Sequence, residues 1–234
     1  MAEVIYGVRP VIEALHSDRR EVFEVLDAVG EKSVASKAAV KRVPVKRVPR
    51  QRIEELARGG AHQGVAARVG PYPYSSLKEI LATTEPLVIV LDSVTDPHNL
   101  GAVLRAADGA GASGVVLPKD RAVGVTSAAV KASAGASEHV PVARETNLRR
   151  ALEKMKEAGM WVYALEEAEA TAYTDLELSG PVAFVLGSEG RGIRRLVREG
   201  CDGAVSIPMR GAVSSLNVSV AAAVLLYEAM RQRG

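Results

Sequence analysis

The chain has 234 residues, a hydrophobic content of 47% and a formal net charge of +2, values typical of a globular protein with one large domain or two small ones. One cysteine, Cys201, excludes an internal disulfide, and the scattered histidines lack metal-ligand spacing, so we expect no metal centre. The first residues do not form a signal peptide, and the longest apolar run, Val220–Tyr227, is too short to span a bilayer, which favours a cytoplasmic protein.

Residues 1–69 are predicted to form a small first domain. We expect a turn and a short helix over Tyr6–Leu15, and strands over Glu21–Ala28 and His62–Val69. Between the strands, Lys32–Arg58 carries nine basic residues and, with the preceding Glu31, three acidic ones. Clustered lysines and arginines release counterions from RNA, so this basic tract is predicted to contact phosphates; a solvated face is the alternative.

A linker is predicted at residues 70–84 and a second domain at residues 85–234. Gly70–Ser76 contains two prolines, a glycine and two serines, and a short helix is expected over Leu77–Ala82. From residue 86 the pattern alternates between strand and helix, which predicts an α/β fold with a parallel sheet and helices on both faces. The expected strands are Leu87–Leu91, Gly114–Leu117, His139–Val142, Met160–Ala164, Val182–Leu186 and Val205–Ile207, and the expected helices are Leu100–Gly109, Ser127–Ala134, Asn147–Ala158 and a stretch from Gly192.

The last predicted helix, Ser215–Arg231, is apolar on nearly every side. Such a helix must be buried on every side, and a terminal helix in a small domain achieves this by packing against a second copy. The sequence therefore predicts a homodimer; a helix at the centre of one core is the alternative.

Polar residues follow the first buried strand at Asp96–Asn99, and Arg105 lies further along the same helix. Asp96 or Asn99 is suited to cap the helix. We expect Asn99 and Arg105 to border one pocket, and an arginine among small residues favours an anionic partner such as phosphate.

Two glycine- and serine-containing turns follow the strands near the end of the chain. Gly187–Gly192 lacks the lysine of a phosphate-binding P-loop, so its glycines are predicted to admit an adenosine-like ligand close to the backbone. Glu189 is predicted either to cap the next helix or to contact substrate. Ser214 and Ser215 are suited to capping or to binding, whereas Asn217 lies too far into the predicted helix for capping.

Taken together, three stretches resemble the SpoU (TrmH) family of the SPOUT superfamily, which transfers methyl groups from S-adenosylmethionine to ribose 2′-hydroxyls of RNA. The stretches are Asp96–Arg105, Gly187–Ile193 and Ile207–Ser219. In addition, Ile5–Val8 and His62–Arg68 resemble a subgroup that methylates a guanosine of large-subunit ribosomal RNA. Between Ala28 and Ala61 the chain is shorter than the family pattern and carries the basic tract like an insert.

The resemblance implies a methyltransferase domain with a deep C-terminal trefoil knot, a small L30e-like RNA-binding domain before it, and a homodimer built on the last helix. The family's active-site positions correspond here to Asn99, Arg105, Glu189, Ser215 and Asn217. Its cofactor-binding loops correspond to Leu186, Gly187, Gly192, Ile207, Pro208, Met209, Ser215 and Leu216.

These features lead us to expect a ribose methyltransferase acting on 23S ribosomal RNA. In this reading Arg105 orients the hydroxyl and an RNA phosphate, because a guanidinium is too weak an acid to act as a simple base. A transfer RNA methyltransferase of the same family and a non-catalytic RNA-binding or ribosome-assembly protein are the alternatives.

Overall fold

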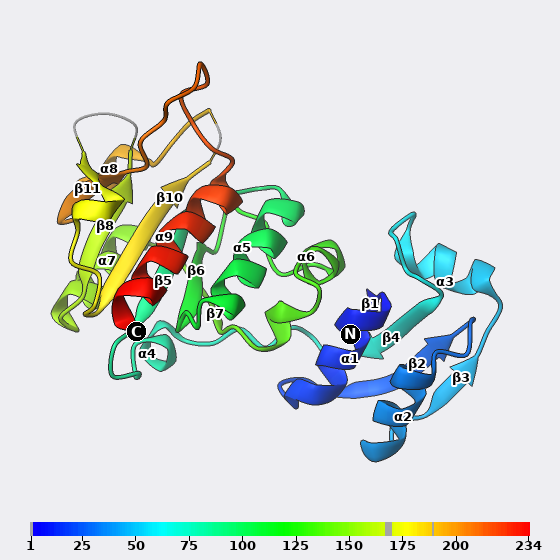
Figure 1. The fold of residues 1–234 in the computed structure, drawn as a ribbon. Helices are drawn as coiled ribbons and strands as arrows, with labels where there is room; N and C mark the ends of the chain where they lie inside the picture. The colour runs from blue at the N-terminus through cyan, green and yellow to red at the C-terminus, as the bar shows by residue number, and fades with distance from the viewer. Residues whose placement is uncertain (1, 167–169, 189) are drawn as a thin grey trace.

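The computed structural model describes residues 2–166, 170–188 and 190–234, and these form two sheets, each with its own helices (Figure 1). The first sheet has the order β1-β4-β2-β3 and the second the order β7-β6-β5-β10-β8-β11-β9. The strands of the first sheet are β1 (Glu3–Tyr6), β2 (Val22–Asp27), β3 (Val45–Arg47) and β4 (Val65–Val69). Those of the second are β5 (Leu87–Asp92), β6 (Gly114–Pro118), β7 (Val142–Glu145), β8 (Trp161–Leu165), β9 (Thr171–Ala172), β10 (Val182–Gly187) and β11 (Gly203–Ser206).

Helix α1 (Val8–Ser17) follows β1, a strand that the sequence analysis missed, and the basic tract that follows β2 is regular structure rather than an insert. It forms α2 (Lys32–Val40), β3 and α3 (Arg50–Ala57). Each helix buries two apolar residues four positions apart, Val34 with Ala38 and Ile53 with Ala57. This spacing places both side chains on one helical face, so the tract is anchored to the core while its charges face solvent.

The segment predicted as a linker is packed against the second sheet. Tyr72 is buried and its hydroxyl donates to the carbonyl of Ser137 at 2.8 Å. The backbone N–H of Ser75 donates to Val142 O at 2.9 Å, next to the edge strand β7. The short helix α4 (Leu77–Ile80) then begins with a reciprocal capping box between Ser76 and Glu79.

Every strand pair of the second sheet is parallel in the described part of the chain, which confirms the predicted α/β fold. Along β5, Ile89 and Leu91 face a core that includes α5 and α9, whereas Val88 and Val90 face a core that includes α7. The sheet is therefore covered on both faces, as its continuous apolar strands require. Its helices are α5 (Pro97–Gly109), α6 (Ser127–Ala132), α7 (Leu148–Glu157), α8 (Arg195–Arg198) and α9 (Val218–Arg233), with short 3₁₀ turns at Ala136–Glu138 and Tyr173–Asp175.

Several helices and strands begin at other residues than predicted. The strand expected from His139 begins at Val142, because the preceding residues form a 3₁₀ turn. The helix expected from Gly192 begins at Arg195, and the last helix begins at Val218 rather than Ser215.

Helix α9 is buried on one side and exposed on the other. Ala222, Leu225 and Leu226 are fully buried against the sheet and α5, as expected for an apolar helix. Val220, Tyr227 and Met230 are exposed, and their spacing of seven and three residues places them in one stripe along the helix. A single chain therefore does not bury α9 on every side. No helix in the described ranges is long and apolar enough to cross a membrane.

Candidate functional site

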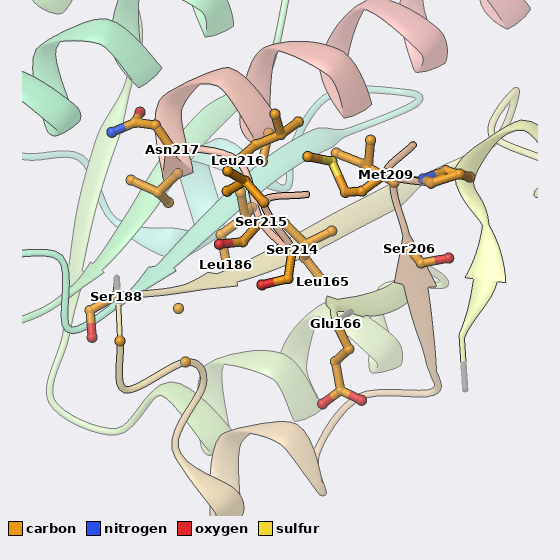
Figure 2. A pocket seen from close by; sticks show the side chains of 18 of the residues that line it. Leu165, Glu166, Leu186, Ser188, Ser206, Met209, Ser214, Ser215, Leu216 and Asn217 are labelled. Atoms are coloured by element: carbon orange, nitrogen blue, oxygen red, sulfur yellow. The ribbon is translucent and has the colours of Figure 1, made fainter. Parts of the chain in front are cut away.

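A cavity of about 1060 Å³ opens at the carboxyl ends of β8, β10 and β11 (Figure 2). In parallel α/β sheets this edge is where ligands bind. The walls are the ends of these strands, the turn after β10 and the segment that joins β11 to α9. All eight residues predicted to bind a cofactor line it: Leu186, Gly187, Gly192, Ile207, Pro208, Met209, Ser215 and Leu216.

The cavity combines apolar side chains with several polar groups. In Figure 2, Leu216 and Met209 lie above Ser214 and Ser215, and Leu186 lies close to Ser215. Glu166 lies on the opposite side, and its carboxylate is bound by Arg198, with Nη2 to Oε2 at 2.7 Å. A pocket that is lined by both apolar side chains and several polar groups suits a small organic ligand with defined hydrogen-bonding groups.

Sequence reasoning missed three polar residues of this wall: Glu166, Ser188 and Ser206. Each lies at or just beyond the end of a strand, since Glu166 follows β8, Ser188 follows β10 and Ser206 ends β11. Their position at the carboxyl edge of the sheet is the signal that would have found them.

Gly187 is required by its own turn. A Cβ atom on Gly187 would lie 2.1 Å from the carbonyl carbon of Gly192 and 2.4 Å from the nitrogen of Ile193. The turn folds back tightly, with Gly192 N donating to Ser188 O at 2.9 Å. The explanation that this glycine serves ligand approach is therefore incomplete, because its missing side chain first admits the backbone of the same turn.

Asn217 joins the start of α9 to α5. Its Oδ1 accepts from the backbone N–H of Ser219 at 2.9 Å, and its Nδ2 donates to Oδ1 of Asn99 at 3.0 Å. The expectation that capping does not explain Asn217 was wrong: the helix begins three residues later than predicted, so Asn217 is its N-cap. Asn217 also lines the cavity, together with Ser214 and Ser215. Asp96 caps α5, accepting from His98 N at 2.8 Å.

Arg105 does not line the cavity that contains the predicted cofactor residues. It is exposed on α5 and borders a second hollow of about 530 Å³ together with Ala102, Ala106 and Tyr227. The expectation that Asn99 and Arg105 border one pocket is not met within one chain, because six residues of regular helix turn Arg105 away from Asn99.

Two further predictions concern Glu189 and the expected lack of a metal centre. Glu189 lies outside the described residues. In the described part of the chain, no group of three or more histidine, cysteine, aspartate or glutamate residues is arranged to hold a metal ion. Burial raises the pKa of the Cys201 thiol to about 12, so this thiol is not a nucleophile at neutral pH.

Family comparisons cover most of the chain. The model of the SpoU rRNA Methylase family matches residues 86–227, and that described as RNA 2′-O ribose methyltransferase substrate binding matches residues 4–75. A 23S rRNA (guanosine-2′-O-)-methyltransferase RlmB of Photorhabdus laumondii is 43% identical over 243 residues, covering 100% of this chain and 99% of the relative.

An uncharacterized tRNA/rRNA methyltransferase of Synechocystis is 46% identical over 78% of this chain, and the match spans 49% of that relative's length. Among solved structures, the SpoU methyltransferase AviRb of Streptomyces viridochromogenes in complex with the cofactor AdoMet has a TM-score of 0.85 and 28% identity, covering 99% of this chain and 90% of that one.

Proposed function

This chain belongs to the SpoU rRNA methylase family, and from that premise we propose that it transfers a methyl group from S-adenosylmethionine to the ribose 2′-hydroxyl of a guanosine in 23S ribosomal RNA. The observation that carries the proposal is the cavity at the carboxyl ends of β8, β10 and β11, where the residues of two family motifs converge. We place this activity in the cytoplasm, where ribosomal RNA is modified.

The cavity fits a nucleoside-sized cofactor. Its volume of about 1060 Å³ lies at the upper end of the usual range for ligand pockets. The apolar side chains of Leu186, Ile207 and Leu216 would contact the adenine, and backbone groups of the segment 207–216 and the hydroxyls of Ser214 and Ser215 would hold its polar edges. When bound, S-adenosylmethionine supplies an electrophilic methyl group on a sulfonium.

The residues of this chain would align the ribose and handle its proton. The Asn99–Asn217 pair links the cavity to α5, so it is suited to orient the ribose beside the cavity. Arg105 lies on the exposed side of the same helix and would bind an RNA phosphate through its planar guanidinium. The hydroxyl proton would then pass to that phosphate or to water.

The first sheet and its helices would bind the RNA. Three basic residues of the tract, Lys41, Lys46 and Arg47, form ion pairs with carboxylates of Asp18, Glu24 and Asp27. In the described part of the chain, Arg50 and Arg58 at the two ends of α3 make no such pair, which leaves them better suited to phosphate. In Figure 1, α3 lies above the first sheet and α2 below it, and the segment before α9 lies at the top of the view.

We also propose a homodimer through α9. The exposed stripe of Val220, Tyr227 and Met230 would be buried against a second copy. Tyr227 also borders the hollow of Arg105, so the partner would cover that hollow and bring a second chain close to Arg105. The trefoil knot of the C-terminal segment remains a prediction from the family resemblance.

Methylation of 23S ribosomal RNA with labelled S-adenosylmethionine tests the proposal, followed by mapping of the modified nucleotide. We expect one methylated guanosine, and no transfer to a synthetic RNA fragment that carries 2′-deoxyguanosine at this position. Transfer to a base atom would contradict the assigned chemistry. Transfer to transfer RNA alone would contradict the assigned substrate.

A further inference from the structure

Asp92 is a fully buried carboxylate at the edge of the candidate site, with 0% of its side chain exposed. It ends β5, and its Oδ2 accepts from the backbone N–H of Arg194 at 2.8 Å. Its Oδ1 accepts from Nε of Arg194 at 2.7 Å and from the hydroxyl of Ser93 at 3.0 Å. The two partners Asp92 and Arg194 are 102 residues apart in the chain.

The same residue holds both ends of the turn that forms one wall of the cavity. At the start of the turn, Gly187 is the direct parallel partner of Asp92 in the pairing of β10 with β5. At its end, Arg194 returns to the Asp92 carboxylate. Between these points, Ser188, Gly190 and Gly192 line the cavity. Fixing both ends restricts the positions that these wall residues can take.

The charge of the pair matters as well as its shape. A buried carboxylate is costly unless it is paired and hydrogen-bonded. The guanidinium of Arg194 supplies the counter-charge from the surface, since 44% of its side chain is exposed. Removing that guanidinium removes little buried apolar surface, so its loss acts mainly on the carboxylate and on the turn.

We infer that Asp92 and Arg194 are positioning residues that hold the turn after β10 in the shape that receives the cofactor. This inference rests on the proposed function, because it assigns these residues to the same cavity. Neither side chain lines the cavity, so both act through the backbone of the turn. A pair that served folding alone would change the melting temperature without changing the affinity of the folded protein for S-adenosylmethionine.

The test compares Arg194→Ala with Arg195→Ala, a matched control. Arg195 is the next residue, its side chain is 80% exposed, and it pairs with Glu199 at 2.7 Å. Calorimetry would measure the affinity for S-adenosylmethionine, and steady-state assays on ribosomal RNA would give kcat and KM. We expect Arg194→Ala to weaken cofactor binding roughly 10- to 100-fold, the loss of one charge-assisted hydrogen bond, with Arg195→Ala unchanged.

The double variant Asp92→Asn/Arg194→Ala tests whether the unpaired carboxylate of Asp92, rather than the lost side chain of Arg194, weakens cofactor binding. It carries no unpaired buried charge, and the amide oxygen still accepts from the backbone N–H at position 194, so we expect it to bind the cofactor more tightly than Arg194→Ala alone. Equal cofactor affinity in Arg194→Ala and Arg195→Ala, both folded, would overturn the inference. A wild-type protein that binds no S-adenosylmethionine would instead overturn the proposed function.

Discussion

Substitution of Arg20 by methionine tests how firmly the two sheets are joined. Arg20 lies just before β2, and its Nε donates to Oε2 of Glu138 at 3.0 Å, across 118 residues of chain. A second bond joins its Nη2 to the other carboxylate oxygen. The side chains of Arg20 and Glu138 are 2% and 0% exposed, so the pair is buried between the two halves of the molecule.

The expected loss of stability follows from this burial. Arg20→Met keeps most of the apolar stem but leaves Glu138 as a buried carboxylate without its cation. Removing one partner of such a pair typically costs about 3–5 kcal/mol in the free energy of unfolding. That is a large part of the roughly 5–15 kcal/mol by which a domain is usually stable. The double variant Arg20→Met/Glu138→Leu is the control, because it leaves no buried charge unpaired; Glu3, the other carboxylate that contacts Arg20, is exposed to solvent.

The pH dependence of the loss has a defined sign. Burial raises the pKa of Glu138 above its ordinary value of 4.5, while the nearby Arg20 lowers it. Without Arg20 the pKa of Glu138 rises further in the folded state. A folded pKa above the unfolded one contributes stability that is present below the unfolded pKa and is lost as pH rises through the folded pKa. The deficit of Arg20→Met is therefore largest near neutral pH and shrinks as pH falls toward 4.5.

Urea unfolding at several pH values measures these differences. A loss of less than about 1 kcal/mol in the free energy of unfolding would mean that the Arg20–Glu138 pair contributes no more than a surface ion pair, which would refute the reasoning. A deficit that does not change with pH would show that Glu138 stays ionised in the variant.

Three further predictions concern RNA, the proposed dimer and catalysis. Arg105→Ala should lower the rate of single-turnover methyl transfer by about 10²–10³-fold. Cofactor affinity measured by calorimetry should stay unchanged, because Arg105 lies outside the cofactor cavity. Near-normal transfer would mean that Arg105 only docks RNA. Val220→Asp should give a folded monomer in sedimentation, because Val220 is 48% exposed in one chain and a dimer would bury the new charge; an intact dimer would contradict this interface. Arg50→Ala/Arg58→Ala should reduce the slope of log K against log salt for RNA binding by roughly 1.4–1.8. Lys46→Ala is the control and should change the slope less, since Lys46 is already paired with Glu24. Equal slopes in the wild type and both variants would exclude these arginines from the RNA interface.

Local patterns in the sequence determined the fold class and the edge of the sheet at which the cavity lies. The run Leu87–Leu91 is apolar at every position, and this pattern indicates a strand in a sheet that helices cover on both faces. The two turns near Gly187 and Ser215 each follow a strand, and neighbouring parallel strands end at one edge. These short-range rules place both turns at one edge of the sheet, and the family resemblance supplied the eight cofactor residues that line the cavity there.

The tertiary structure alone decided which distant groups meet. In the sequence Asp92 directly follows the predicted strand Leu87–Leu91, and nothing near it in the sequence indicates Arg194 as its partner. The ion pair of Arg20 and the packing of Tyr72 likewise depend on how the two sheets pack together, which no local pattern encodes. Arg105 shows the same limit in reverse. The sequence gives the spacing between Asn99 and Arg105. Which neighbours each side of α5 contacts depends on the packing of the whole chain, and this packing places Asn99 beside Asn217 and Arg105 at the second hollow.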